Sequence, residues 1–543
     1  MPATLTYPGV YVEEVPSGVH TITGVATSIT AFIGRAERGQ VDDPTTINSF
    51  GDYERNFGGL STLSPMSFAV RDFYLNGGSQ AVIVRVHNGA TASRITLPTE
   101  PGSPPSPNPP ADNLLLDAAS PGSWGSRLVA MVDHETKDKA DRHLFNLTVQ
   151  EIDPNTNQVL NNERFLNVSV QSANARFIGR VLDQGSGLVR VAKDNTGAFL
   201  MPNGRPLETT VAASPPASPP GPGIQQPVKA VGGTDGGDVT GVNFNGPNFQ
   251  ANKRGLFALE KVDLFNLLCI PPFSFTADVS TALIGTAASY CEDRRAMLLV
   301  DSPSSWTTKK IARDQFSDPN TDFVGTRSNH AAIFFPRVRE INPLHDNQLE
   351  DFAPCGAVAG VFARTDAQRG VWKAPAGQDA TLVGVPQLSV SLTDDENGEL
   401  NPLGVNCLRA FPIIGRVVWG ARTLQGADQL ASEWKYIPVR RTALYIEESL
   451  YRGTKWVVFE PNDEPLWAQI RLNVGAFMQN LFRQGAFQGR TPREAYFVKC
   501  DKETTTQNDI NLGIVNILVG FAPLKPAEFV VLKIQQMAGQ IET

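Results

Sequence analysis

The chain has 543 residues, enough for about three or four domains, and its 47 Lys and Arg against 55 Asp and Glu give a formal net charge of -8. Hydrophobic residues make up 41% of the chain and charged residues 19%, a balance that excludes an intrinsically disordered protein. The acidic balance also excludes a protein that binds nucleic acid through a bulk basic surface.

The N-terminal region and the cysteines indicate the compartment. Residues 1–9 (MPATLTYPG) contain neither a basic nor an apolar region, so no secretory signal is expected. No apolar run approaches the roughly 18 residues that a membrane-spanning helix needs. The 5 cysteines are widely spaced and odd in number, which is typical of thiols in a reducing cytosol and not of a disulfide framework or a zinc site. We therefore expect a cytosolic protein that does not insert into membranes.

The first third of the chain is divided by proline. A strand-like run at residues 10–15 (VYVEEV) follows Pro8-Gly9. Further on, residues 101–110 (PGSPPSPNPP) and 214–223 (SPPASPPGPG) are too rich in proline to join a sheet or a helix, which predicts extended linkers. Between them, residues 111–213 contain alternating runs such as LFNLTV and FLNVSV. This pattern predicts a separate, mostly β module held by two tethers.

The middle third has a different pattern. Short continuous apolar runs lie at residues 264–270 (LFNLLCI), 296–300 (AMLLV) and 331–335 (AAIFF), and residues 278–294 have helical spacing. Apolar strands that alternate with helices are typical of a parallel sheet covered on both faces. The sequence therefore predicts an α/β unit here.

The last 150 residues also alternate. We expect strands at residues 434–439 and 456–459 and a helix at residues 440–451. The clearest helix spans residues 465–484, because Asn462 or Asp463 can cap it and Gly485 can end it. One face of this helix is predicted to be core: Leu466, Ile470, Phe477 and Leu481.

A second strand-like run lies near the end of the chain, at residues 529–536 (FVVLKIQQ) after Pro526. It has apolar residues on both faces, so it needs cover on its faces and pairing along its edges. Either the run closes the chain's own sheet, or it pairs with the sheet edge of a neighbouring subunit. The residues alone leave both arrangements open.

Four segments carry residue types that serve in catalytic or ligand sites, and each has a simpler interpretation. The glycine-rich residues 231–241 lack the Lys-Ser/Thr pair of a phosphate loop, so a surface loop is expected. The acidic and histidine residues 133–143 and the acidic residues 394–398 lack the ligand spacing of zinc and calcium sites, which favours a solvated loop and a turn. Asp301 ends an apolar run where α/β enzymes place catalytic groups, but a cap or turn is the commoner role there.

The charge is unevenly distributed. Residues 402–500 contain thirteen Lys and Arg against eight Asp and Glu, a local charge of +5 within an acidic chain. This segment could face an acidic partner, or it could form an ordinary solvated surface.

Several blocks of the sequence form a recognisable set: YPGVYV (7–12), GVATS (24–28), AFIG (31–34), INSFGDYERNFGG (47–59), VAGVFARTDAQRGVWKAP (358–375), LNPLGVN (400–406), VVWGART (417–423), RRTALYIEESLYRGTKWVVFEPNDE (440–464), YFVKCDKETTTQ (496–507) and PAEF (526–529). These blocks resemble contractile tail sheath proteins of bacteriophage tails and of phage-tail-like contractile injection systems. The similarity extends over both ends and the middle of the chain and weakens between about residues 89 and 241.

The resemblance implies a mixed α/β subunit of several domains. An N-terminal arm (1–23) and a C-terminal arm (521–543) would flank a conserved sheath core made of residues 24–88 and 380–520. Residues 231–379 would form a middle α/β domain, and residues 89–230 a variable, mostly β outer insertion. In this family the arms add strands to a neighbour's sheet, which here implies roles for Val10, Tyr11, Val12, Glu13, Phe529, Val530, Val531, Leu532 and Ile534.

The resemblance also implies a mechanical function without a catalytic site, metal or cofactor. Sheath subunits stack as six-fold rings around an inner tube, and a trigger from the baseplate releases a metastable extended state that drives the tube through a target envelope. The expected partners are further copies of the chain, the inner tube protein, and baseplate and terminal cap proteins. The expected place of assembly is the bacterial cytoplasm, within a virion tail or a phage-tail-like particle. The candidate tube-facing residues are Arg471, Arg483 and Arg490.

Two other classes of function remain as alternatives. One is an α/β metabolic enzyme with a site near Asp301, and the other is a static shell protein.

Overall fold

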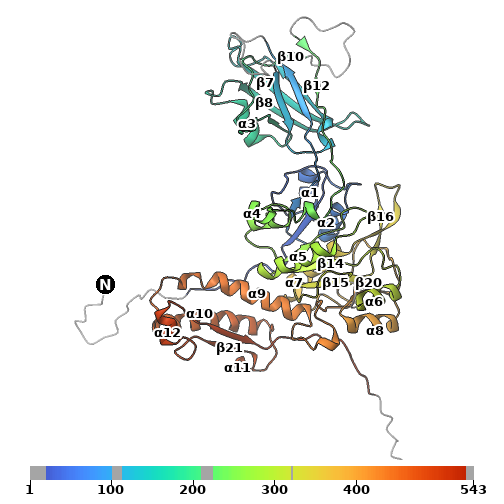
Figure 1. Ribbon diagram of the computed structural model, residues 1–543, viewed down its shortest axis with the longest axis vertical. Coiled ribbons are helices and arrows are strands. Elements are labelled where there is room, and N and C mark those ends of the chain that lie inside the picture. Colours follow the sequence, from blue (N-terminus) through green and yellow to red (C-terminus); the bar gives the residue numbers. More distant parts are fainter. Residues whose placement is uncertain (1–19, 101–112, 210–223, 319–321, 534–543) are drawn as a thin grey trace, which may run out of the picture.

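The computed structural model describes residues 20–100, 113–209, 224–318 and 322–533. Figure 1 shows three parts stacked along the long axis: a β-rich outer module at the top, a body built on a large sheet, and a C-terminal layer of helices at the bottom. The predicted arm residues Val10, Tyr11, Val12, Glu13 and Ile534, and the whole of both proline tracts, lie outside the described residues.

The body is organised around an eight-stranded sheet of order β2-β3-β1-β13-β14-β15-β19-β20. The strands from β3 to β19 in this order run parallel, and β2 and β20 are antiparallel to their neighbours. The predicted parallel sheet is confirmed, and one predicted run, AAIFF, coincides with β15. The bounds are β1 Thr30–Gly34, β2 Thr45–Ile47, β3 Ala81–Arg85, β13 Leu267–Cys269, β14 Met297–Asp301, β15 Ala331–Phe335, β19 Asn406–Phe411 and β20 Gly415–Val418.

Successive side chains of each strand point to opposite faces of the sheet, and each face packs in its own hydrophobic core. Ala31 and Ile33 of β1 join one cluster, whereas Phe32 between them joins the other. Both faces are therefore apolar, which explains why these strands read as continuous apolar runs. The first face packs against α5 Thr281–Asp293, α6 Lys309–Ser317 and α8 Asp394–Leu400, and the second against α1 Phe50–Phe57, α2 Met66–Leu75 and α7 Cys355–Arg369.

The sheet draws strands from three separate segments of the chain. Strands β1 to β3 come from residues 30–85, β13 to β15 from residues 267–335, and β19 and β20 from residues 406–418. The expected boundary between residues 231–379 and the core segments therefore does not coincide with the edge of a sheet. The division into domains stays a prediction.

The outer module has its own hydrophobic cluster, which includes Trp124, Phe145 and Leu182. It consists of two small antiparallel sheets, one two-stranded parallel sheet (β10 with β11) and one α-helix. The pair of Arg38 with the buried Glu151 (2.8 Å) connects it to the body. Its elements are β4 Arg94–Pro98, β5 Asn113–Ala118, β6 Leu128–Asp133, β7 Leu144–Ile152, β8 Val159–Ser169, α3 Ile178–Gly185, β9 Val189–Val191, β10 Glu208–Thr209, β11 Ile224–Gln225 and β12 Val228–Lys229.

The C-terminal layer is built on two long helices, α9 Ile437–Gly453 and α10 Glu464–Arg483. The predicted helix at residues 465–484 is confirmed: the Asp463 side chain accepts a hydrogen bond from the Leu466 amide, and Gly485 follows the helix with φ of 79°. The predicted core face is also buried. The remaining elements of the layer are α11 Pro492–Ala495, β21 Tyr496–Lys499, α12 Gln507–Asn511 and β22 Leu518–Phe521.

Three predictions of local structure were wrong. Residues 437–439 are the first turn of α9 and not a strand, because Pro438 fits the first helical turn. Residues 456–459 form a short 3-10 helix (Lys455–Val457) and a turn, with Val458 and Phe459 exposed. The expected turn at residues 394–398 is the start of α8, where Thr393 and Glu396 form a reciprocal capping box.

Smaller elements complete the described chain. A three-stranded sheet beside the body contains β16 Val338–Asn342, β17 Gln348–Phe352 and β18 Gln387–Leu388, and one short helix is α4 Phe249–Asn252. Further 3-10 helices span Ser123–Arg127, Gly241–Asn243, Gly255–Lys261, Asn401–Leu403 and Asp428–Leu430.

A buried pair of carboxyl groups joins α2 to β16. Arg71 contacts both groups, at 2.9 Å to Asp72 and 2.5 Å to Glu340, and both acidic side chains are almost completely buried. Burial, and then the neighbouring Asp72, raises the pKa of Glu340 to about 9, and burial also raises the pKa of Asp72. With one arginine for two acids, the folded protein keeps a proton on this pair at neutral pH.

Because the folded state binds that proton more tightly than the unfolded chain, the contribution of the pair to stability is fully present below about pH 4.5 and is lost as the pH rises toward 9. We expect Glu340→Gln to remove this dependence, since glutamine mimics the protonated acid. Between pH 6 and pH 8.5 the wild type should lose about 1.4 kcal/mol per pH unit relative to the variant in urea unfolding. Glu350→Gln, at the cross-strand neighbour, is the control and should keep the wild-type slope. Equal slopes for wild type and Glu340→Gln would contradict the shared proton.

Candidate interaction site at the two ends of the described chain

The C-terminal segment is fixed to the body by one buried arginine. The side chain of Arg422 is fully buried and donates to both carboxylate oxygens of Glu528, from Nε at 2.8 Å and from Nη2 at 2.6 Å. The Tyr436 hydroxyl donates to the same carboxylate at 3.2 Å. Burial alone would lower the pKa of Arg422, but Glu528 and Asp428 outweigh it and hold that pKa above its usual range. A bidentate pair of this kind fixes both position and direction.

Beyond this anchor the chain leaves the body. Phe529, Val530, Val531 and Leu532 are 75–83% exposed, and no strand among the described residues pairs with them. Four consecutive large apolar residues in solvent are unusual, because each would gain about 1.5–3 kcal/mol on full burial. Of the predicted C-terminal arm, Phe529, Val530, Val531 and Leu532 thus lie outside the chain's own sheets, whereas Phe521, its first residue, belongs to β22.

The first described residues are bound along the C-terminal layer. The His20 ring stacks on Trp456 at 4.2 Å, and the His20 amide donates to Asn473 Oδ1 at 3.1 Å. Ile22 is buried against Gly453, where any Cβ would lie 2.6 Å from the isoleucine side chain. Gly24 is needed for a similar reason, since its Cβ would lie 1.9 Å from the hydroxyl of Tyr445.

The two attachment points flank α9. Tyr436, which contacts Glu528, is the N-cap of α9, and Trp456, which contacts His20, follows its C-terminal end. A helix of 17 residues is roughly 25 Å long. The chain therefore enters and leaves the C-terminal layer at opposite ends of one rigid element, as Figure 1 shows.

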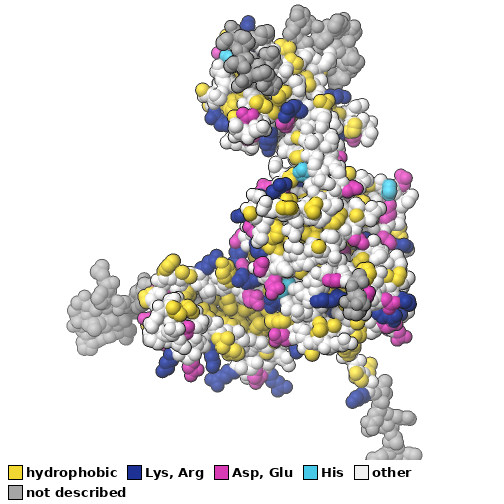
Figure 2. All heavy atoms as spheres, in the orientation of Figure 1, with side chains coloured by type: hydrophobic (Ala, Val, Ile, Leu, Met, Phe, Trp, Pro, Cys, Tyr) yellow, Lys and Arg dark blue, Asp and Glu magenta, His cyan; other side chains and the backbone are white. Residues whose placement is uncertain are grey.

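The same layer contains a small sheet with open edges. Strands β21 and β22 pair only with each other among the described strands, so each has one edge free of a partner. A groove of about 470 Å³ lies beside β22. It is lined by Glu447, Leu450 and Tyr451 of α9, Thr454 directly after that helix, Val474 of α10, and Arg295, Ile517 and Val519. Figure 2 shows hydrophobic side chains gathered on this layer. Unpaired edges beside a partly apolar groove can accept an added strand.

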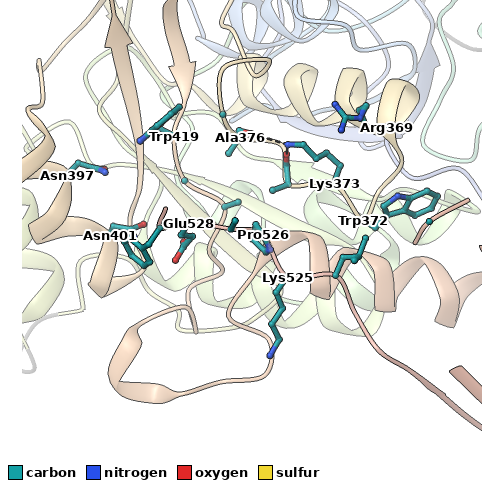
Figure 3. Close-up of a pocket in the computed structure, with 18 of the residues that line it drawn as sticks. Arg369, Trp372, Lys373, Ala376, Asn397, Asn401, Trp419, Lys525, Pro526 and Glu528 are labelled. Carbon is teal, nitrogen blue, oxygen red and sulfur yellow. Dashed lines mark hydrogen bonds between the residues drawn. The ribbon is translucent and has the colours of Figure 1, made fainter. Parts of the chain in front are cut away.

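A larger cavity of about 750 Å³ lies beside the C-terminal attachment point (Figure 3). Residues 524–529 form one wall, and the indoles of Trp372 and Trp419 contribute to the others. Lys373 lies among them and donates to the carbonyl oxygens of Ala374 and Ala376, at 2.8 and 3.3 Å. Burial lowers the pKa of Lys373.

The structure does not bring the three candidate tube-facing arginines into one patch with shared partners. Arg471 contacts Glu464 at 2.6 Å and the carbonyl of Cys500, so it is tied to its own layer. Arg483 ends α10, and Arg490 lies between α10 and α11; both are exposed. Their role stays a prediction.

The side chain of Asp301 accepts a hydrogen bond from the first residue of helix α7. Its Oδ1 accepts the Cys355 amide at 2.8 Å, at the start of α7, and burial raises its pKa to about 6. The nearby Ser304 donates to Asp278 instead. The Cys355 thiol lies beside the Asp301 carboxylate, but burial raises the pKa of that thiol well above its usual value, which keeps it neutral and weakly nucleophilic. The Asp301 carboxylate therefore serves as an acceptor at the start of α7.

The other motifs also find internal partners. In the glycine-rich loop, Asp235 accepts hydrogen bonds from Ser123, which joins the loop to the outer module. No group of three or more metal-ligating side chains occurs in the described ranges, and the 5 cysteines are free and buried. None of the helices in the described part of the chain is long and apolar enough to cross a membrane.

Sequence reasoning missed Arg422, Tyr436 and Trp456. Arg422 and Glu528 are 106 positions apart, so no local pattern links them. A signal did exist, because the two residues lie in the VVWGART and PAEF blocks that carry the family resemblance.

Comparison with known proteins identifies the family. The family model described as phage tail sheath protein central domain matches residues 251–424, and the model described as phage tail sheath C-terminal domain matches residues 430–537. Together the two matches cover slightly more than half of the chain. The chain belongs to the phage tail sheath family.

Individual relatives agree with this assignment. A prophage major tail sheath protein of Pseudomonas aeruginosa (strain UCBPP-PA14) is 26% identical over 273 residues, which are 48% of this chain and 62% of that protein. The tail sheath protein of Vibrio phage KVP40 is 27% identical over 33% of this chain and 25% of its own length. The chain thus spans less than two thirds of these relatives.

A solved structure extends the likeness to almost the whole fold. A chain from the six-fold symmetrised baseplate of the anti-feeding prophage superposes with a TM-score of 0.55 at 23% identity, over 98% of this chain and all of that one. The predicted mixed α/β class is confirmed.

The anchor can be tested by removing its carboxylate. In Glu528→Ala the buried Arg422 keeps Asp428 but loses its bidentate partner, so residues 524–528 should loosen by about 3 kcal/mol. Chymotryptic cleavage within residues 524–529 should accelerate by about 100-fold, because the protease needs this segment detached from the body. Asp428→Asn touches the same arginine outside the segment and should leave the cleavage rate unchanged. Equal cleavage rates in Glu528→Ala and wild type would exclude the anchor.

Proposed function

We propose that this chain is the subunit of a contractile tail sheath. It polymerises as stacked six-fold rings around an inner tube and contracts from a metastable extended state to drive the tube through a target envelope. The observation that carries the proposal, beside family membership, is the exposed apolar segment that starts at Phe529, directly after the Glu528 anchor, in a chain with an open-edged sheet. A donor strand and an acceptor edge on one molecule support an open, repeating assembly.

The C-terminal segment of one subunit adds to the β22 edge of a neighbour. Phe529, Val530, Val531 and Leu532 present apolar side chains on both faces of an extended strand, and Leu450 and Tyr451 of α9 and Val474 of α10 offer apolar cover in the groove beside β22. The N-terminal residues Val10, Tyr11, Val12 and Glu13 add a second strand in the same way. The work of contraction then comes from subunit interfaces, and the chain is not an enzyme; the role of Asp301 as an acceptor at the start of α7 supports this.

The remaining partners follow from the same function. The tube is gripped from the basic C-terminal segment, with exposed Arg483 and Arg490 better placed than Arg471, whose guanidinium already has partners. Baseplate and terminal cap proteins hold the two ends of the sheath. Assembly takes place in the bacterial cytoplasm, and the finished particle is a virion tail or a phage-tail-like particle.

Deletion of residues 1–15 tests the N-terminal exchange. The truncated chain should keep its fold, since the described attachment begins at His20, but should form no tubes. Negative-stain microscopy of purified protein should show long hollow tubes for the wild type only, with matching circular dichroism spectra. Normal tubes from the truncated chain would rule out this arm.

Replacement of Val531 by proline tests strand addition by the C-terminal segment. Proline removes a backbone donor and cannot join the middle of a sheet, so tube formation should fall at least tenfold. Val531→Thr keeps the donor and the β-branched shape and serves as the matched control. Light scattering during polymerisation reports both, and equal rates for the two variants would argue against backbone pairing at this position.

A further inference from the structure

A buried histidine connects the central sheet to helix α9. His330 directly precedes β15 and is only 2% exposed. Its Nδ1 lies 3.1 Å from the carbonyl oxygen of Ala296, and its Nε2 lies 2.7 Å from Nη2 and 3.2 Å from Nε of Arg440. A guanidinium can only donate hydrogen bonds, so Nε2 is the acceptor and Nδ1 carries the proton that is donated to Ala296. The contact therefore requires the neutral form of the ring.

A second proton on the ring would break this contact. It would occupy Nε2 and would place a positive charge 2.7 Å from the guanidinium of Arg440, in a site closed to solvent. Burial, and then Arg440, lower the pKa of His330. Glu292 of α5 and Glu447 of α9 are the other charged groups that act on the ring; they favour its charged form and offset only part of the shift. The contact is thus intact at neutral pH and is lost in acid.

Arg440 lies where α9 holds the C-terminal segment. Its amide donates to the carbonyl oxygen of Tyr436 at 3.1 Å, and the Tyr436 hydroxyl donates to Glu528. Apart from His330, the acceptor that the guanidinium has among the described residues is Glu447, at 3.4 Å, whose side chain is 43% exposed. When the ring is charged, the start of α9 therefore keeps a surface contact within its own helix and loses its buried contact with the sheet.

We propose that the pair of His330 and Arg440 is a proton-sensitive latch between the central sheet and the start of α9. The latch is closed at neutral pH. In acid the ring becomes charged, Arg440 turns towards Glu447, and the root of the C-terminal segment loosens. This inference rests on the proposed sheath function, because in a polymerised sheath that segment connects neighbouring subunits. Acid then weakens assembled tubes through a joint inside each subunit.

His330→Gln separates the effect of the proton from that of the contact. The glutamine carbonyl still accepts from Arg440 and takes up no proton. Because the closed latch binds the proton of His330 less tightly than the opened state does, its contribution to stability is fully present above about pH 6.5 and is lost as the pH falls below that value. Opening of the start of α9 in the wild type should therefore increase by up to about tenfold per pH unit below pH 6.5.

Amide hydrogen exchange of residues 437–444 reports this opening. Wild type and His330→Gln are compared at the same pH, so that the intrinsic exchange rates cancel. The two proteins should exchange equally at pH 7.5, and the wild type should exchange about tenfold faster at pH 5.5. His345→Gln, at an exposed histidine between β16 and β17, is the matched control and should follow the wild type at both pH values. Equal exchange in wild type and His330→Gln at pH 5.5 would overturn the latch.

Arg440→Gln tests the same latch from the helix and does not depend on the folding of His330→Gln. It removes the guanidinium that His330 faces, so the latch is open at every pH. Exchange of residues 437–444 should exceed that of the wild type at pH 7.5 and approach it at pH 5.5. Wild-type exchange in Arg440→Gln at pH 7.5 would show that the pair does not hold the helix.

Assembled tubes test the consequence for the sheath. Tubes formed at pH 7.5 are moved to pH 5.5 and followed by light scattering and negative-stain microscopy. Wild-type tubes should shorten or come apart about tenfold faster than tubes of His330→Gln. An exchange difference in a chain that forms no tubes at pH 7.5 would contradict the sheath function alone. Tubes with the same response to acid in both proteins would contradict this inference alone.

Discussion

The pair between Arg422 and Glu528 is the constraint on which the C-terminal segment depends. A guanidinium without solvent contact must have its donors satisfied, and here a carboxylate, an aspartate and two carbonyl oxygens do so. Because one of these acceptors, Glu528, directly precedes the exposed residues 529–532, satisfying the arginine also determines where these apolar residues emerge. Local electrostatics in the body thus sets the direction of a segment that pairs with no strand among the described residues.

Helix α9 connects this anchor to the attachment point of the N-terminal segment. Arg441 of α9 pairs with Asp366 at 2.6 Å, both buried, and Glu448 and Arg452 connect the same helix to Arg295 and Asp263. The helix is therefore fixed to the body along its length while its ends hold the two chain segments. Helix α9 can therefore transmit force between the N-terminal and C-terminal segments. This property would suit the proposed sheath subunit, which must stay connected to its neighbours while it moves.

The sequence predicted the parts of the fold whose signals are local. Strand β15 and helix α10 follow from a continuous apolar run and from a cap, a proline and a glycine in sequence. The strands predicted at residues 434–439 and 456–459 were wrong, although aromatic and β-branched residues favour strands there. In the first segment Pro438 lies in the first turn of a helix, and in the second Phe459 is exposed and does not pack in a sheet. The anchor could not be derived, since burial of Arg422 depends on a partner 106 positions away.

The energetics explain why several weak exchanges suit a sheath better than one strong contact. Full burial of four large apolar side chains is worth about 6–12 kcal/mol, whereas ordering four residues costs about 4–8 kcal/mol in backbone entropy. One added strand would therefore leave only a modest net gain, so the proposed lattice would depend on many such contacts acting together. The pair of Arg422 and Glu528 holds the C-terminal segment at its root and leaves residues 529–532 free of the body. In the proposed lattice the bodies could then turn relative to one another while the added strands stay paired.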